Sequence, residues 1–190
     1  MKWIVALAFV TCAVLGWMTF SQTNAEEGKP AATEPKREEV KKTPWDGYDK
    51  WYHLTEGRAI TGDPTGFLGN REFEKGYREV YVNGVGEAVS KGKAPYVYPE
   101  GTILVREVYS DKSAWETKKT PALTISMKLA KGSAPESKDW EYVLIPPGEA
   151  EQRGKGDSKT AQFCATCHLN AGVSNDYLFT NASFFEKLKK

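Results

Sequence analysis

Four segments between residues 77 and 145 constrain the fold of this 190-residue chain most strongly. Each of them alternates β-branched or aromatic residues with polar ones, as strands with one buried face do. Glycine and proline residues at 57–70 indicate a loop before them, and the polar stretch at 130–139 is typical of a hairpin turn. We therefore expect an antiparallel sheet with strands at 77–83, 102–110, 123–129 and 140–145.

Helices are expected before and after these strands in the sequence. Pro44 suits the first turn of a helix, because a proline there has no hydrogen bond to lose. That helix would present the residues Tyr48, Trp51, Tyr52 and Leu54. Residues 158–169 predict a second helix, with Asp157 or Ser158 as its N-cap, and residues 182–190 predict a closing one. The sequence thus indicates an α+β domain, an antiparallel β-sheet with flanking helices.

The N-terminal residues indicate where the protein acts. Lys2 precedes an uncharged, mostly apolar run at 3–20, and a small polar stretch then ends at Ala25. This order is typical of a secretory signal peptide, so we expect cleavage near Ala25 and a periplasmic protein. An uncleaved N-terminal anchor is the alternative, because the run is close to the length that spans a bilayer. Only in that case do we expect contact with a membrane.

The remaining chain divides into two parts. Residues 26–43 are strongly charged, include prolines and have almost no bulky apolar side chains. Such a segment does not bury enough surface to fold, so we expect a flexible tether between the signal peptide or anchor at 1–25 and a folded domain at 44–190.

The composition argues against several classes of function. The 26 Lys and Arg residues nearly balance the 25 Asp and Glu residues, whereas nucleic-acid binding needs a concentrated basic face. Two histidines are too few for most zinc sites made of protein side chains, and three cysteines are too few for a disulfide-rich scaffold. A compact domain that takes its chemistry from a cofactor fits these numbers.

The sequence Cys-Ala-Thr-Cys-His at 164–168 is the attachment signature of a c-type haem. On one helical turn, two sulfurs at this spacing can meet the two vinyl groups of a single porphyrin, and His168 then lies beneath the iron. A redox-active dithiol is the alternative, but such motifs follow a first strand rather than lying near the end of a chain. We therefore expect one covalent haem c, held by Cys164 and Cys167 on a C-terminal helix, with His168 as an axial iron ligand.

The group on the other side of the iron decides what such a haem does. Met127 is expected to pack within its strand and His53 to lie on the first helix, and neither Met nor His follows His168. We therefore expect an open distal position that binds a small ligand such as NO, CO or hydroxylamine. The alternative is a six-coordinate electron-transfer cytochrome that uses Met127 or His53 and needs a redox partner, such as another cytochrome.

Together these features resemble the cytochrome P-460 and cytochrome c′-β family, whose members are β-rich and carry one c-type haem. The resemblance covers residues 47–190. The segment REVYV at 78–82 is similar to an Arg-x-Val-Tyr-Val strand of that family, and GTILVRE at 101–107 is similar to its Gly-Thr-x-x-x-Lys-Glu strand. Trp140 before an apolar strand, the haem motif and the Phe-Thr pair at 179–180 follow in the same order.

One position departs from the family pattern. In the P-460 enzymes the lysine of the second strand is bonded to the haem ring, which is tied to hydroxylamine oxidation, and Arg106 stands there in this chain. A guanidinium stays charged at neutral pH and is a poor nucleophile, so we expect no such bond. This favours the c′-β branch, whose members are associated with NO, over a hydroxylamine-oxidising enzyme. Lys118, Lys119 and Lys128 are the other lysines considered for such a bond.

Two arginines are candidates for the distal side. The resemblance places Arg78 there, as a donor to the ligand or a clamp on a haem propionate, and the alternative is a solvated strand residue. Arg106 either lies there too or pairs with Glu107 or a propionate. An oligomer is compatible with each of these interpretations. Aromatic residues that either wall a distal pocket or pack in the core are Phe67, Phe73, Tyr81, Trp115, Trp140, Tyr142 and Phe179.

Overall fold

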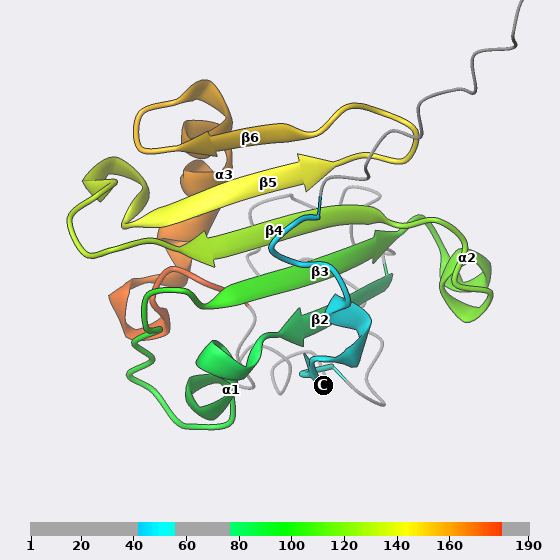
Figure 1. The fold of residues 1–190 in the computed structure, drawn as a ribbon, viewed down its shortest axis with the longest axis horizontal. Coiled ribbons are helices and arrows are strands. Elements are labelled where there is room, and N and C mark those ends of the chain that lie inside the picture. The colour runs from blue at the N-terminus through cyan, green and yellow to red at the C-terminus, as the bar shows by residue number, and fades with distance from the viewer. Residues whose placement is uncertain (1–41, 56–76, 180–190) are drawn as a thin grey trace, which may run out of the picture. The chain divides into compact units, whose positions relative to one another are not determined.

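The computed structural model of the protein describes residues 42–55 and 77–179 (Figure 1). The chain divides into two units, residues 1–40 and residues 41–190, and all described residues belong to the second unit. They form a six-stranded antiparallel sheet whose strand order follows the chain. Its strands are β1 (Tyr52–His53), β2 (Tyr77–Val82), β3 (Ile103–Tyr109), β4 (Ala122–Lys128), β5 (Trp140–Ile145) and β6 (Gln152–Lys155). Together with the helices packed against this sheet, they confirm the predicted α+β class.

The register of the strands assigns the side chains to two faces. Residues that are paired across antiparallel strands point to the same side of a sheet. Val82 pairs with Leu104, and Tyr142 continues the same row two strands further on. Val105 pairs with Ile125 in the neighbouring row, which points the other way. We call the first side the α3 face, after the helix that covers it, and the second side the opposite face.

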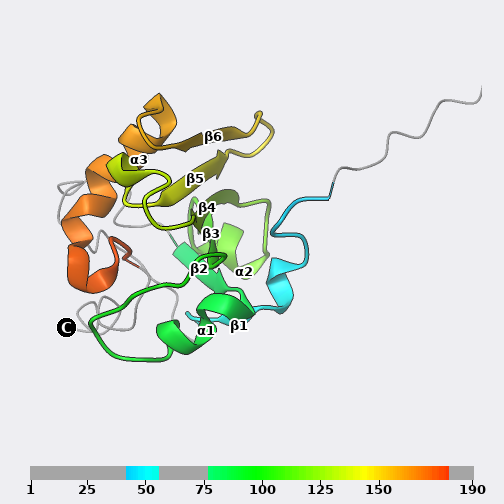
Figure 2. The same cartoon turned by 60° about the vertical axis from the view of Figure 1, so that its left-hand side comes forward.

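Each face carries one half of the core. Helix α3 (Lys159–His168) packs on the α3 face, where its Ala161 and Ala165 join a buried cluster that includes Trp140. The N-terminal segment with the 3₁₀ helix η1 (Tyr48–Lys50) covers the opposite face. Figure 2 shows these two elements on opposite sides of the sheet. The buried cluster of the opposite face consists of Trp45, Val105, Ile125, Met127 and Val143.

The start of α3 is held close to the edge of the sheet. Ser158 is the N-cap, as one of the two predicted residues, and its side chain accepts a hydrogen bond from the Ala161 amide at 3.3 Å. Gly154 of β6 makes this approach feasible. A Cβ there would lie 2.2 Å from Ser158 Oγ and 2.9 Å from the Ala161 nitrogen. A glycine in the last strand therefore lets the helix rest directly on the sheet.

The helix predicted from Pro44 through Leu54 is wrong. The chain forms only the short η1 there and then pairs as β1 with β2, with Tyr52 opposite Val82. The Leu54 amide continues this ladder with a hydrogen bond to the Val80 carbonyl at 2.9 Å. Pairing with the exposed edge of β2 satisfies backbone groups and still partly buries the aromatic side chains, so tertiary contacts override the helical spacing.

Several elements were missed by the sequence patterns. Helix α1 (Gly84–Ser90) starts at Asn83 and helix α2 (Lys112–Glu116) starts at Asp111, and both caps accept a hydrogen bond from the third residue after them. The remaining 3₁₀ helices in the described part are η3 (Pro135–Ser137), η4 (Leu169–Ala171) and η5 (Val173–Asn175).

The predicted tether, the loop at 57–70 and the closing helix at 182–190 lie outside the described residues, apart from 42 and 43 of the tether. The signal peptide or anchor at 1–25 lies outside them as well. Within the described ranges, the structure holds no helix that is both long and apolar enough to cross a membrane.

Candidate functional site

Cys164, Cys167 and His168 occupy the last turns of α3. The two cysteines are not joined to each other, and both are half-buried. Cys164 packs against the core cluster of the α3 face. Residues three apart on a helix lie on the same side of it, so both sulfurs are presented along one edge. This is the arrangement that two thioether bonds to one porphyrin require.

The imidazole of His168 is oriented by a backbone group. Its Nδ1 lies 2.9 Å from the Tyr177 carbonyl oxygen. A carbonyl only accepts, so Nδ1 carries the proton and Nε2 keeps the lone pair that a metal ligand needs. The ring packs beside Tyr142 and Phe179, with ring centroids 4.9 Å and 5.9 Å away. Burial, together with the charge of Arg106, lowers the pKa of His168 to about 4, so the ring is neutral at pH 7.

Two arginines face the same side of the sheet as this helix. Arg106 pairs with Val80 and Arg78 pairs with Val108, so the two guanidinium groups project from neighbouring strands onto the α3 face. Arg106 Nε donates to Thr124 Oγ1 at 2.9 Å. Burial, and secondly the charge of Arg78, lower the pKa of Arg106 to about 10. Two cations brought together in a desolvated place favour an anion between them, and haem carries two propionates.

The structure argues against two of the alternatives for these arginines: a solvated Arg78, and an Arg106 that pairs with Glu107. Arg78 is buried, with only 8% of its surface exposed, so it is not a solvated strand residue. Glu107 points to the opposite face, where the hydroxyls of Tyr48 and Tyr109 donate to its carboxylate. Arg106 therefore does not pair with Glu107, because successive residues of a strand point to opposite sides. Within the described residues the side-chain partner of Arg106 is Thr124, and a contact with a propionate or a distal ligand stays a prediction.

The comparison with protein families agrees with this geometry. The family model described as cytochrome P460 matches residues 45–180. The chain belongs to the cytochrome P460 family. None of the curated proteins matches it. Membership of the cytochrome P460 family implies a c-type haem, and the positions of Cys164 and Cys167 on the C-terminal helix are consistent with its attachment.

In this cytochrome P460 domain the two candidates for a sixth iron ligand, Met127 and His53, lie on the opposite face of the sheet from His168. Met127 belongs to the buried cluster of the opposite face. His53 also faces that side, since it pairs with Tyr81, stacks on its ring at 4.5 Å and lies 2.6 Å from Glu79 Oε2. The sheet separates both of them from His168. The interpretation of Met127 as a packing residue is confirmed.

The three lysines considered for a bond to the haem ring are placed differently. Lys118 lies on the opposite face, 3.5 Å from a carboxylate oxygen of Glu79. Lys119 lines a pocket beside α2. Lys128 is on the α3 face, but its ammonium lies 2.8 Å from Asp176 Oδ1 and also donates to a backbone carbonyl. An ion-paired ammonium is a poor nucleophile, so the geometry of Lys118 and Lys128 does not favour them as substitutes in the family's cross-link.

The aromatic candidates divide between the two faces. Tyr142 and Phe179 pack around His168, and Trp140 is fully buried in the core of the α3 face. Tyr81 and Trp115 lie on the opposite face, away from the haem motif, where both contact groups around Glu79. Phe67 and Phe73 lie outside the described residues.

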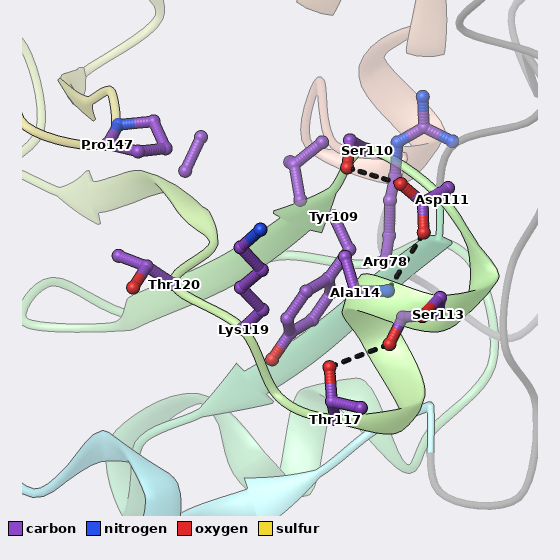
Figure 3. Close-up of a pocket in the computed structure, with 12 residues that line it drawn as sticks. Arg78, Tyr109, Ser110, Asp111, Ser113, Ala114, Thr117, Lys119, Thr120 and Pro147 are labelled. Atoms are coloured by element: carbon purple, nitrogen blue, oxygen red, sulfur yellow. Dashed lines mark hydrogen bonds between the residues drawn. The ribbon is translucent and has the colours of Figure 1, made fainter.

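A pocket of about 690 Å³ lies at the end of the sheet next to α2 (Figure 3). It shares Arg78 with the arginine pair, and Val108 and Ala122 extend it along the α3 face. None of the three motif residues lines it. No sequence pattern predicts this pocket, because residues from three strands, a short helix and the segments that connect them form it. Its polar lining residues include Ser110, Asp111, Ser113, Thr117, Lys119 and Thr120.

Proposed function

We propose that this chain is a mono-haem c-type cytochrome of the cytochrome P460 family with an open distal site. The ligand that fits best is NO or another small nitrogen-containing molecule. One observation carries the proposal: Met127 and His53 lie on the face of the sheet away from His168. Neither of them can complete the coordination of an iron held by His168, and no other Met or His stands in the chain outside residues 1–25.

Each residue of the motif has a separate task in this proposal. Cys164 and Cys167 supply the sulfurs for two thioether bonds, and His168 supplies Nε2 as the proximal ligand. When bound, the haem supplies an iron atom that takes a small ligand on its vacant side. Arg78 and Arg106 hold propionates or donate to the bound ligand, because both are buried cations on the α3 face.

The same observations give less support to two other functions. A hydroxylamine-oxidising enzyme of the P-460 type would need an amine in place of the Arg106 guanidinium, and the ammonium of Lys128 is already paired with Asp176. A six-coordinate electron carrier would need a second protein ligand on the α3 face. We therefore propose a gas-binding protein, in which a redox partner matters only if the iron changes its oxidation state.

The proposed location is the periplasm, in accordance with the apolar run at 3–20. Membrane attachment would follow only if residues 1–25 stay in place. A nucleic-acid partner is not part of the proposal, because the chain has a net charge of only +1.

The proposal is tested by absorption spectra of the oxidised and reduced protein, with and without NO, together with an intact mass. We expect one haem bound through two thioether bonds, a five-coordinate high-spin spectrum and a large spectral change with NO. A mass that shows an additional bond between a side chain and the haem would favour the hydroxylamine enzyme. A six-coordinate low-spin spectrum in both oxidation states would contradict the open site.

A further inference from the structure

Asp176 lies one residue before the carbonyl that orients His168, and its side chain is buried with a lysine from the sheet. We propose that the Lys128–Asp176 pair is a positioning device for the axial ligand, which fixes the Tyr177 carbonyl and thereby sets the donor strength of His168. This inference rests on the proposed haem attachment, but it concerns residues outside the haem motif.

Three groups from different parts of the chain hold Asp176. Lys128 Nζ of β4 lies 2.8 Å from Oδ1, and the Tyr98 amide donates to Oδ2 at 2.9 Å. The indole Nε1 of Trp140 in β5 donates to the backbone carbonyl of Asp176 at 3.0 Å. Asp176 is 8% exposed and Trp140 is fully buried, so these contacts are shielded from water. Asp176 is therefore fixed at both its side chain and its backbone.

The backbone at this point adopts an uncommon conformation. Asp176 and Tyr177 both have positive φ angles, 46° and 61°. Two consecutive residues other than glycine rarely adopt the left-handed region, and bulky residues such as tyrosine do so least readily. Such a turn persists only where the surroundings hold it. Here the turn directs the Tyr177 carbonyl to His168 Nδ1, 2.9 Å away.

Lys128 supplies the charge that makes this anchor strong. Its side chain is only 14% exposed, its ammonium lies 4.6 Å from the centre of the Trp140 ring, and it also donates to the Lys138 carbonyl at 3.3 Å. A buried ion pair is costly to break, because the remaining charge is left without a partner. A continuous chain of contacts thus runs from strands β4 and β5 through Asp176 and Tyr177 to the imidazole.

The consequence concerns the metal ligand directly. A hydrogen bond from Nδ1–H to a well-placed acceptor raises the basicity of Nε2, and loss of such a bond weakens the bond to the metal. A weaker donor stabilises the ferric state less, so the reduction potential rises. The pair would therefore tune the haem without contact with it.

The test uses the haem-loaded full-length protein and the variants Asp176→Asn and Lys128→Met. Both keep the side-chain volume and remove one charge of the pair. We expect a lower iron–histidine stretching frequency of the ferrous protein in resonance Raman spectra of each variant. The reduction potential should rise in Asp176→Asn, whereas in Lys128→Met the loss of a cation opposes that rise. Lys128→Arg keeps the charge and should stay close to the parent. The matched control is Glu141→Gln, which breaks the ion pair with Arg153, at 3.1 Å, away from Asp176.

The results separate the inference from the proposed function. A parent protein without covalent haem would overturn both. A haem-loaded parent whose two variants retain its stretching frequency would overturn the inference alone, even if both variants lost stability or changed the reduction potential. If one variant does not fold, the other decides, because each removes the same ion pair from a different element.

Discussion

Glu79 and Glu107 are paired directly across β2 and β3, and both side chains are buried on the face opposite α3. Like charges at such positions destabilise a sheet unless other groups neutralise them. Glu79 accepts hydrogen bonds from Thr55 and Trp115, both at 2.6 Å, and His53 lies at the same distance. Glu107 is surrounded by tyrosine hydroxyls. The face away from the haem motif thus contains a polar network, and its donors make the two carboxylates compatible.

The first prediction concerns acid stability. Burial raises the pKa of Glu79, but the hydrogen bonds from Thr55, Trp115 and His53 outweigh it and the pKa is lowered. A carboxylate whose pKa is lower in the folded state stabilises the fold above its unfolded pKa of about 4.5 and loses this contribution as the pH falls through the folded value. Glu79→Gln should therefore cost about 1.5–3 kcal/mol at pH 7 and much less at pH 3.

Urea unfolding between pH 7 and pH 3 measures this effect. The matched control is Glu87→Gln, because within the described residues the Glu87 side chain forms an exposed pair with Lys91 and no other ion pair. We expect the control to follow the parent curve. A Glu79→Gln variant that runs parallel to the parent across the whole range would contradict the assigned role of the network.

The second prediction concerns the hydroxyl groups on Glu107. Tyr109→Phe removes a donor at 2.8 Å and Tyr48→Phe removes one at 2.9 Å, and each leaves a buried carboxylate with one partner fewer. Each variant should lose about 1–3 kcal/mol of unfolding free energy in urea titrations. Tyr77→Phe is the control, because that ring stacks on Trp115 and no hydrogen bond of its hydroxyl occurs in the described part of the chain. Equal stability of all three variants would show that the network contributes nothing.

The strands were predictable because their segments are rich in β-branched and aromatic residues, mix them with polar ones and are bounded by turn residues. The bounds of β5 agree with the sequence prediction and those of β2 differ by one residue. Strand β6 was not predictable, because its sequence QRGK has no alternation of apolar and polar residues. Its register is set by pairing with β5. The helix expected from Pro44 does not form beyond its first turn. Its aromatic spacing fits a helix, but residues 52 and 53 pair with the edge of β2 as a strand.

The candidate site was predictable as far as it consists of side chains in one motif. Cys164, Cys167 and His168 are recognisable from their spacing alone. The Tyr177 carbonyl that orients His168 left no signal, because a backbone group has no sequence signature. The positions of Met127 and His53 behind the sheet depend on strand register, which a pattern of single residues does not fix.

The third prediction concerns these two residues. Met127→Leu and His53→Gln should leave the visible spectrum of the haem protein and its response to NO unchanged, because both side chains lie on the opposite face. His53→Gln is expected to lower stability through its contact with Glu79, and Met127→Leu should cost less than about 1.5 kcal/mol. A shift of the Soret band in either variant would show that the residue coordinates the iron. His168→Gly is the positive control, since it removes the proposed ligand itself.

The fourth prediction concerns the arginine pair. Arg106→Gln and Arg78→Gln each remove a positive charge from the α3 face, and a nearby cation disfavours the ferric state. Both variants should lower the reduction potential, by on the order of 1 kcal/mol for a buried unit charge. Arg153→Gln is the matched control, because Arg153 lies on the opposite face above Trp45. Equal potentials in all four proteins would contradict a place for either arginine beside the haem.

The last prediction concerns the approach of α3 to the sheet. Gly154→Ala would place a Cβ 2.2 Å from Ser158 Oγ and 2.9 Å from the Ala161 nitrogen. The cap must then move, and with it the start of the helix that carries the cysteines, so we expect a loss of about 1–3 kcal/mol and a smaller fraction of chains with covalent haem. Gly84→Ala, in the first turn of α1, meets nothing within 4 Å and should be neutral or stabilising by up to about 1 kcal/mol. Urea unfolding and intact mass measure the two effects, and a Gly154→Ala variant as stable and as fully loaded as Gly84→Ala would show that the close contact at β6 does not position α3.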